Sequence, residues 1–264
     1  MGIFISIPTK SALKKAIKKK YVTVNEMIAS TATFIKGGEK IYLSIPTEIQ
    51  TKNKLVFPLK VIFEDNHLAI IHKPAGILVS GNSFKTVANA LEQNIQLSTL
   101  PDAVKPQPVH RLDYPTTGIL LVGKTSSSIR ALNKLFEDKE IEKTYHAIVI
   151  GDLNNNGIID TPIDHKEAES NYTKLQSVPS KRFGQLNLVE LKPLTGRRHQ
   201  LRKHLAGQGN PILGDQKYGI EGMILHGKGM YLHAYSLRFM HPFIKEEMYV
   251  VDEVMERFGK IFNL

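Results

Sequence analysis

The sequence contains no cysteine, which excludes both disulfide bonds and thiolate metal sites. Disulfides form mainly in proteins outside the reducing cell interior, so for a chain without cysteine we expect an intracellular protein and predict a cytoplasmic location. Long apolar runs are also missing. The N-terminal run at residues 3–7 is too short for a membrane span or a secretory signal, and polar residues follow it. We therefore expect no membrane partner.

Several catalytic motifs are absent as well. The sequence has no Gly-x-Ser-x-Gly elbow of the serine hydrolases. His199 and His204 stand five residues apart rather than four, and no intervening glutamate completes a zinc-hydrolase motif. The loop around Asp113 holds a single acid, so it lacks the paired carboxylates of glycoside hydrolases. We expect no metal site.

Positive charge, by contrast, is abundant. The chain has 35 Lys and Arg against 25 Asp and Glu, a formal net charge of +10. Such an excess favours a polyanionic partner, to which affinity should fall steeply as salt rises. Many basic proteins bind no nucleic acid, so the charge alone leaves ordinary solubility open as its explanation.

The chain has the length and apolar content for one main domain and one small domain, with 264 residues of which 42% are hydrophobic. Residues 46–58 are polar and bracketed by prolines, which indicates a linker. We therefore predict a small N-terminal domain over residues 1–50 and a main domain over residues 51–264.

Strand-like runs outnumber helical ones and are joined by turns of hairpin length. This pattern favours an α+β fold with a mixed, mostly antiparallel sheet over a doubly wound parallel one. The periodicity predicts helices at residues 11–20, 86–97 and 127–139 and strands at residues 21–24, 40–45, 59–63, 68–72, 119–123, 143–150, 172–178 and 185–191. Turns are expected at residues 36–39, 64–67, 73–76 and 154–157.

One loop holds the strongest candidate for chemistry. Residues 109–124 read VHRLDYPTTGILLVGK, so Asp113 follows Arg111 and precedes Pro115 at the start of an apolar strand. Loops held by a rigid scaffold often carry functional groups. Aspartates also commonly cap turns through a bond from side chain to backbone. The loop alone leaves both roles open.

A second segment concentrates positive charge. Residues 194–218 read LTGRRHQLRKHLAGQGNPILGDQKY. Thr195 and Gly196 indicate the start of a helix, whose free N–H groups and neighbouring arginines would bind phosphate or carboxylate. A solvated basic face is the alternative. Part of the segment is expected to pack on a core, because it also holds Leu201, Leu205, Ile212 and Leu213.

Together these segments resemble the RluA-type pseudouridine synthases, which isomerise uridine in ribosomal or transfer RNA. The family's nucleophile motif, His-Arg-Leu-Asp followed by Thr-Ser-Gly, is matched at residues 110–113 and 116–118, with Thr117 in place of the usual serine. The later motif, Thr-Gly-Arg-x-His-Gln-(Ile/Leu)-Arg-x-His-Leu, is matched at residues 195–205. Further matches lie at residues 142–145, 211–219 and 232–242, so the resemblance covers roughly residues 58–245.

The N-terminal part carries a separate resemblance. Residues 11–43 are similar to the S-four-like RNA-binding domain that many of these synthases carry, with the opening helix cut short. We therefore predict a truncated domain of this kind ahead of a main domain with the pseudouridine synthase fold, a bent sheet with its active site in a cleft across the middle.

The resemblance also implies roles for three residues, without any cofactor. Asp113 would be the nucleophile, or else would stabilise charge developing at the sugar while a glycal-like intermediate forms. Arg202 would pair with Asp113, an opposite charge that favours the ionised carboxylate. Tyr145 would stack against the target base and assist proton transfer, the alternative being an ordinary tyrosine of a partly buried strand.

Five basic residues are candidates for RNA binding. Arg111 would occupy the space that a flipped base vacates, or else contact a phosphate. The remaining four would position phosphates rather than take part in catalysis: Lys73, Arg197, Arg198 and Lys203.

The sequence thus predicts a site-specific pseudouridine synthase acting on a stem-loop of ribosomal or transfer RNA. We expect a monomer without an obligate protein partner. Two alternatives stay open. The first is a non-catalytic RNA-binding or ribosome-assembly factor on the same fold, and the second is a nucleosidase that stops after cleavage and releases free uracil.

Overall fold

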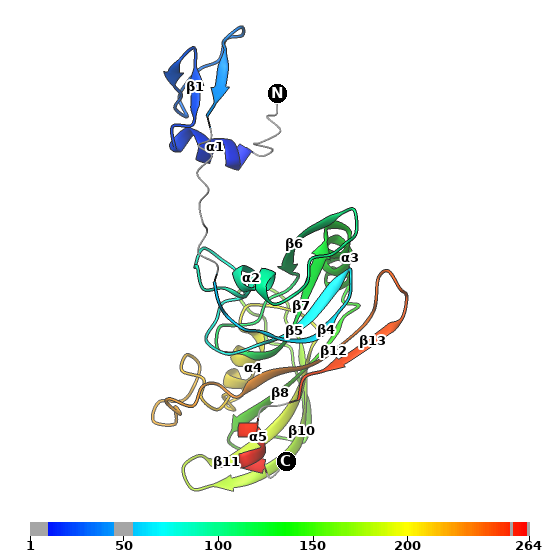
Figure 1. Ribbon diagram of the computed structural model, residues 1–264. Coiled ribbons are helices and arrows are strands. Elements are labelled where there is room, and N and C mark those ends of the chain that lie inside the picture. The colour runs from blue at the N-terminus through cyan, green and yellow to red at the C-terminus, as the bar shows by residue number, and fades with distance from the viewer. Residues whose placement is uncertain (1–9, 45–54, 254–255, 263–264) are drawn as a thin grey trace. The chain divides into compact units, whose positions relative to one another are not determined.

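The computed structural model describes residues 10–44, 55–253 and 256–262 (Figure 1). The chain divides into two compact units, Met1–Asn53 and Lys54–Leu264. Most of the predicted linker at residues 46–58, and with it the predicted boundary at residue 50, lies outside the described residues. Among the helices that are described, none is long and apolar enough to cross a membrane.

The smaller unit consists of one helix packed on a small antiparallel sheet. Ala16 of the helix and Val22, Val24 and Ala29 form its buried core. Its described elements are α1 (Lys10–Lys18), β1 (Val22–Val24), β2 (Met27–Ile28) and β3 (Ile41–Leu43), with the strands in the order β2-β1-β3. The helix and two of these strands lie where the periodicity predicts them. Assignment of the unit to an S-four-like domain stays a prediction.

The larger unit is built on one mixed sheet, to which ten strands of the described residues belong. Their order is β4-β5-β7-β12-β8-β11-β10-β9, while β13 pairs with β12 and β6 pairs with β7. The pairs between these strands are antiparallel except β7–β12, which is parallel. The predicted α+β class with a mixed, mostly antiparallel sheet is therefore confirmed. The strands are β4 (Lys60–Glu64), β5 (Leu68–Lys73), β6 (Ala103–Pro108), β7 (Thr117–Thr125), β8 (Glu142–Ile150), β9 (Asn156–Ile159), β10 (Ser170–Ser180), β11 (Gly184–Pro193), β12 (Leu232–Met240) and β13 (Glu247–Val251).

Short helices accompany this sheet. They are α2 (Val87–Ala90), the 3₁₀ turn η1 (Leu91–Gln93), α3 (Ser126–Glu137), α4 (Gln200–Gly207) and α5 (Glu256–Phe262). α3 begins where the sequence predicts it, because Thr125 and Ser128 form a reciprocal capping box. The prediction of one helix over residues 86–97 is only partly right, since α2 and η1 are shorter. The turn predicted at residues 154–157 is wrong at its end, where Asn156 already opens β9.

Strand β7 is the rigid centre of the unit. All of its residues are buried, and its side chains alternate between two apolar clusters. Leu120 and Val122 pack into one with the α2 region, while Ile119 and Leu121 pack into the other with Leu132 of α3. A strand buried on both faces reads as a continuous hydrophobic run, which explains the sequence ILLV. The loop that precedes β7 is therefore attached to a strand that is packed on both faces.

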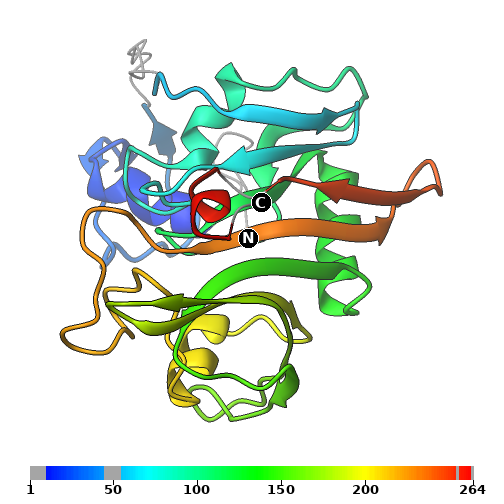
Figure 2. The same cartoon turned by 90° about the horizontal axis from the view of Figure 1, so that it is seen from below.

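Strand β12 joins the two halves of the sheet. Figure 2 shows it (orange) running beside β8 (green) through the middle of the larger unit. Its residue Ala234 pairs with Gly118 of β7 on one side and with Tyr145 of β8 on the other. A register shift follows between Ala234 and Ser236, and such a bulge bends a strand locally. β12 therefore fixes how the loop before β7 faces β8.

Candidate active site

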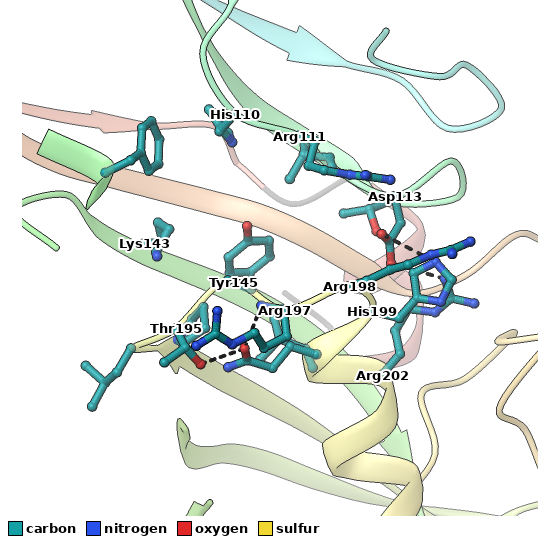
Figure 3. Close-up of a pocket in the computed structure, with 18 of the residues that line it drawn as sticks. His110, Arg111, Asp113, Lys143, Tyr145, Thr195, Arg197, Arg198, His199 and Arg202 are labelled. Carbon is teal, nitrogen blue, oxygen red and sulfur yellow. Dashed lines mark hydrogen bonds and ion pairs between the residues drawn. The ribbon is translucent and has the colours of Figure 1, made fainter. Parts of the chain in front are cut away.

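A cavity of about 640 Å³ opens in the larger unit beside the C-terminal end of α3 and between three further segments. The loop before β7 contributes Arg111 and Asp113, strand β8 contributes Lys143 and Tyr145, and the segment leading into α4 contributes residues 193–202. Figure 3 shows these side chains converging on the same space. The cavity thus brings together the two motif segments that the sequence singles out.

Asp113 faces the cavity from its loop. Its backbone carbonyl accepts a hydrogen bond from the Thr116 N–H at 3.1 Å, which closes the turn. Its carboxylate instead accepts from Arg202 Nη1 at 3.1 Å and lies 3.7 Å from His199 Nε2. Since the backbone already closes the turn, the carboxylate is left for the cavity.

Lys73 binds the main chain of the loop that carries Asp113. Its Nζ donates to three backbone carbonyls, those of Pro74 (2.9 Å), Tyr114 (3.3 Å) and Thr116 (2.8 Å), and the residue is fully buried. Burial lowers the pKa of Lys73 to about 8, against the opposing effect of the Asp113 charge. The prediction that Lys73 contacts an RNA phosphate is therefore wrong. An ammonium with three carbonyl acceptors and no access to solvent is a tie between β5 and the Asp113 loop.

Arg202 is clamped between two carboxylates. On one side it donates to Asp215 through Nε at 2.7 Å and Nη2 at 2.9 Å, and on the other through Nη1 to Asp113. The fork suits the planar guanidinium, whereas a lysine offers only a point charge. Asp215 also accepts from the backbone N–H groups of Lys217 and Tyr218. Burial works against its charge, but Arg202 and these two N–H groups together outweigh burial and hold the pKa of Asp215 below its usual value.

Tyr145 lies on β8 and packs against two apolar clusters, one that includes Leu112 and Leu120 and another that includes Leu201 and Leu232. Burial raises the pKa of its phenol, and the negative charge of Asp113 raises it further. The group therefore stays protonated at neutral pH. It can offer a ring face and an O–H donor, but it is not a ready base.

His199 also reaches Asp113, a contact that was not predicted from the sequence. It precedes α4 in the left-handed conformation, with φ of 56°. Its Nδ1 shares a hydrogen bond of 2.9 Å with the Tyr218 hydroxyl, which leaves Nε2 facing the carboxylate. Burial lowers the pKa of His199, with Asp113 opposing and Arg202 reinforcing the shift. The only signal in the sequence was its place inside the 195–205 motif.

The segment before α4 differs from the prediction. The helix begins at Gln200 rather than at Thr195 and Gly196, because the Gln200 side chain folds back over the loop. Its Oε1 accepts from Thr195 Oγ1 at 2.7 Å and from the Arg197 N–H at 2.9 Å. The four apolar residues that were expected to pack on a core, Leu201, Leu205, Ile212 and Leu213, are buried.

The basic residues divide into two groups. Arg111, Arg197 and Arg198 are exposed and line the cavity. Lys203 does not line it and pairs with Asp164 at 2.9 Å. Around the cavity, Lys and Arg side chains outnumber acids by six to two, the six being Arg111, Lys139, Lys143, Arg197, Arg198 and Arg202 against Asp113 and Glu137. This balance suits an anionic substrate.

Comparison with known sequences places these features in context. Residues 67–207 match the family described as RNA pseudouridylate synthase. The ribosomal large subunit pseudouridine synthase D of Nitrosomonas europaea is 34% identical, over 89% of this chain and 74% of that protein. A tRNA pseudouridine synthase C of Vibrio parahaemolyticus is 31% identical, over 78% of this chain and 94% of its own length. An uncharacterized RNA pseudouridine synthase of Aquifex aeolicus is 31% identical, over 97% of this chain and 89% of its own.

Solved structures share the fold. Human RNA Pseudouridylate Synthase Domain Containing 4 superposes with a TM-score of 0.63 at 24% identity, covering 77% of this chain and 92% of that one. Human RNA Pseudouridylate Synthase Domain Containing 1 gives a TM-score of 0.62 at 22% identity, covering 75% and 85%.

Proposed function

Because the chain belongs to the RNA pseudouridylate synthase family and is an RNA pseudouridine synthase, we propose that Asp113 carries its reaction, with Arg202 and Tyr145 as partners. The observation behind this assignment is the carboxylate of Asp113, turned into the cavity and paired there with a buried arginine.

The reaction is an isomerisation in which a carboxylate of this kind can take part directly. The bond between the sugar and the uracil nitrogen breaks, the base turns, and carbon 5 bonds to the same sugar carbon. Carbon 5 then loses its proton and the freed nitrogen gains one, so that no atom is gained or lost overall. Asp113 would attack the sugar carbon as nucleophile or stabilise the positive charge that develops there. Arg202 would keep the carboxylate ionised and aimed, since an opposite charge favours the charged form.

Tyr145 would serve as the platform for the base. Its ring lines the cavity and its flanks are packed against apolar side chains. Because its pKa is raised, we assign it stacking and hydrogen-bond donation during proton transfer rather than the role of a standing base.

For the substrate, we propose a uridine in structured ribosomal or transfer RNA. Relatives of this chain are named for the large ribosomal subunit and for tRNA. Reaching the base requires flipping it out of a stem or loop, which costs a few kcal/mol. Arg111 is exposed two residues before Asp113, where its guanidinium would fill the vacated space.

Arg197 and Arg198 would position RNA phosphates at the rim of the cavity. Lys203 would contact a phosphate farther along the RNA, because it and its partner Asp164 lie outside the cavity. We further propose that the enzyme acts as a monomer in the cytoplasm, without an obligate protein partner.

The test is a map of pseudouridine in total RNA from cells carrying either the wild-type gene or Asp113→Asn. We expect one or more uridine positions to lose their signal in the mutant, because the amide is neither nucleophile nor charge stabiliser. The affinity of the purified variant for RNA should stay within about threefold of wild type, since phosphate contacts dominate binding. Retained turnover by the variant would contradict the assignment of Asp113, and free uracil among the wild-type products would favour a nucleosidase.

A further inference from the structure

Lys143 is a cation without a partner inside the cavity. It lies on β8 two residues before Tyr145, and residues two apart on a strand face the same side. In the described part of the chain its ammonium group makes no hydrogen bond and no ion pair, although the residue is only partly exposed. Charged side chains that lose water are normally paired. The absence of an acid therefore points to an anion that comes from outside.

The surroundings of Lys143 strengthen this reading. Lys139, which lies two residues past the end of α3 in the left-handed conformation with φ of 60°, also lines the cavity. Burial and the charge of Lys139 both lower the pKa of Lys143. Glu142, the adjacent residue on β8, points to the opposite face of the strand, and Glu137 lines the cavity without pairing to Lys143. Among the described residues neither lysine pairs with a carboxylate, and two such neighbouring cations repel each other until an anion binds.

Two aromatic rings complete this end of the cavity. Phe136 of α3 lies 4.9 Å from the ring of His110, measured between centroids. His110 is fixed by the Leu121 N–H, which donates to its Nε2 at 2.9 Å. Burial and the nearby Lys143 lower the pKa of His110 to about 3, so its ring is neutral. Apolar ring faces beside unpaired cations are the composition with which proteins bind single-stranded nucleotides.

The position of this group sets it apart from the reacting centre. In Figure 3, Tyr145 stands between Lys143 on one side and Asp113 on the other. Lys143 pairs with Leu237 of β12, farther along the strand than Ala234, which pairs with Tyr145. A cavity of about 640 Å³ is of the size that holds a drug-sized ligand, so it offers room beyond one flipped base.

We propose that this end of the cavity is a second subsite, in which Lys143 and Lys139 bind the phosphodiester next to the target uridine and Phe136 and His110 offer ring faces to the adjoining nucleotide. The proposal rests on the proposed function, because it takes the reacting uridine to lie at Asp113. It makes Lys143 a binding residue for the substrate backbone rather than a participant in bond breaking.

The test uses the full chain carrying Asp113→Asn and a fluorescein-labelled hexauridylate as the probe. Its dissociation constant is measured by fluorescence anisotropy over roughly 50 to 300 mM KCl, with and without Lys143→Gln. Losing one phosphate contact on a single strand should reduce the slope of log affinity against log salt by about 0.7. We expect affinity at the lowest salt to fall about threefold to tenfold, and Lys143→Arg to restore most of it.

Lys134→Gln is the matched control, because Lys134 is an exposed lysine of α3 that pairs with Asp138 and does not line the cavity. It should leave the salt slope unchanged. Lys143→Met, which keeps the apolar stem, replaces the glutamine variant if the latter melts early. Phe136→Leu should weaken binding without changing the slope.

An unchanged slope for Lys143→Gln would overturn the proposal. The proposal would also be overturned if Lys143→Gln bound RNA normally but lowered the single-turnover rate at saturating RNA when Asp113 is present. Lys143 would then act on the reaction rather than on binding. The binding readout needs no turnover. A failed assignment of Asp113 would therefore appear in the pseudouridine map, and a failed subsite would appear here.

Discussion

The guanidinium of Arg202 joins the proposed catalytic carboxylate to the protein interior. Two of its nitrogens are occupied by Asp215 and a third reaches Asp113. Asp215 in turn is held by two backbone N–H groups of the following turn. The direction of the Asp113 carboxylate is thus set by a chain of charge-assisted bonds, each stronger than a neutral one.

Arg202→Lys should separate charge from geometry. A lysine keeps the positive charge but cannot bridge both carboxylates, so we expect the single-turnover rate to fall at least 100-fold. The free energy of unfolding should drop by about 2 kcal/mol, the size of a lost hydrogen bond to a charged group. Both are measured on purified protein, by product formation and by urea denaturation. Arg198→Lys at the exposed rim is the control, and equal losses in the two variants would contradict a special role for Arg202.

At this scale the sequence led to some residues and missed others. Asp113 and Arg202 are 89 residues apart in the chain and in contact in the structure, a pairing that the family motifs implied. Lys73 was misassigned because a lysine after a strand ordinarily reaches solvent. Two of its three carbonyl partners belong to Tyr114 and Thr116, which only folding brings next to it. The left-handed conformation of His199 has no glycine or asparagine to announce it.

Among the elements, strands β7 and β12 approach each other so closely that no side chain fits at Gly118. Gly118 has φ of +110°, and a Cβ placed there would lie 2.2 Å from the Ala234 carbonyl oxygen. Next to it, Thr117 Oγ1 shares a hydrogen bond of 2.8 Å with buried His233 of β12. The two strands can pair at this distance only because residue 118 lacks a side chain.

Gly118→Ala should therefore destabilise the fold by roughly 3 kcal/mol or more, from backbone strain and from a clash with main-chain atoms that cannot move aside. Gly184→Ala is a matched control, because its φ is +73° but nothing lies within 4 Å of the added Cβ. It should cost only the strain, about 1 to 2 kcal/mol. Chemical denaturation measures both, and equal losses would argue against the close approach of the strands.

Elements with strong patterns were predictable and those without were not. Buried β7 and capped α3 stand out in the sequence, whereas β6, with the residues AVKPQP, contains two prolines that disfavour a strand assignment. The start of α4 was displaced because the Gln200 amide, rather than a cap at Thr195, organises the preceding loop. These bonds span only three and five residues, but a single side chain makes them and they leave no periodic trace in the sequence.

Considered as a whole, the molecule should be sensitive to acid. Burial lowers the pKa of five histidines, His110, His146, His199, His204 and His233. The unfolded chain takes up these protons near the ordinary histidine value, while the folded chain resists them. Stability from this source is complete above about pH 6.5 and is lost as the pH falls toward the lower folded values.

We accordingly expect the melting temperature to decline from pH 6.5 to pH 4.5. His146→Phe should flatten this decline, because its ring can still stack on Tyr235, 4.0 Å away, but no longer titrates. The pKa of His146 in the folded protein is about 4, so at acid pH the unfolded chain binds up to one more proton at this residue than the folded chain does. The variant removes this difference, which changes the free energy of unfolding by up to about 1.4 kcal/mol per pH unit. Exposed His226→Gln should leave the slope as it is, and a pH-independent melting temperature in wild type would refute the scheme.

The place of β12 between β7 and β8 also governs when the site can exist during synthesis. Asp113 emerges from the ribosome early, and Tyr145 and Arg202 follow, but the strand that sets β7 against β8 comes only with residues 232–240. Contacts between such distant segments form late, because the long intervening chain must first be closed. A nascent chain that ends before β12 therefore holds all three proposed catalytic residues without the framework that aligns them.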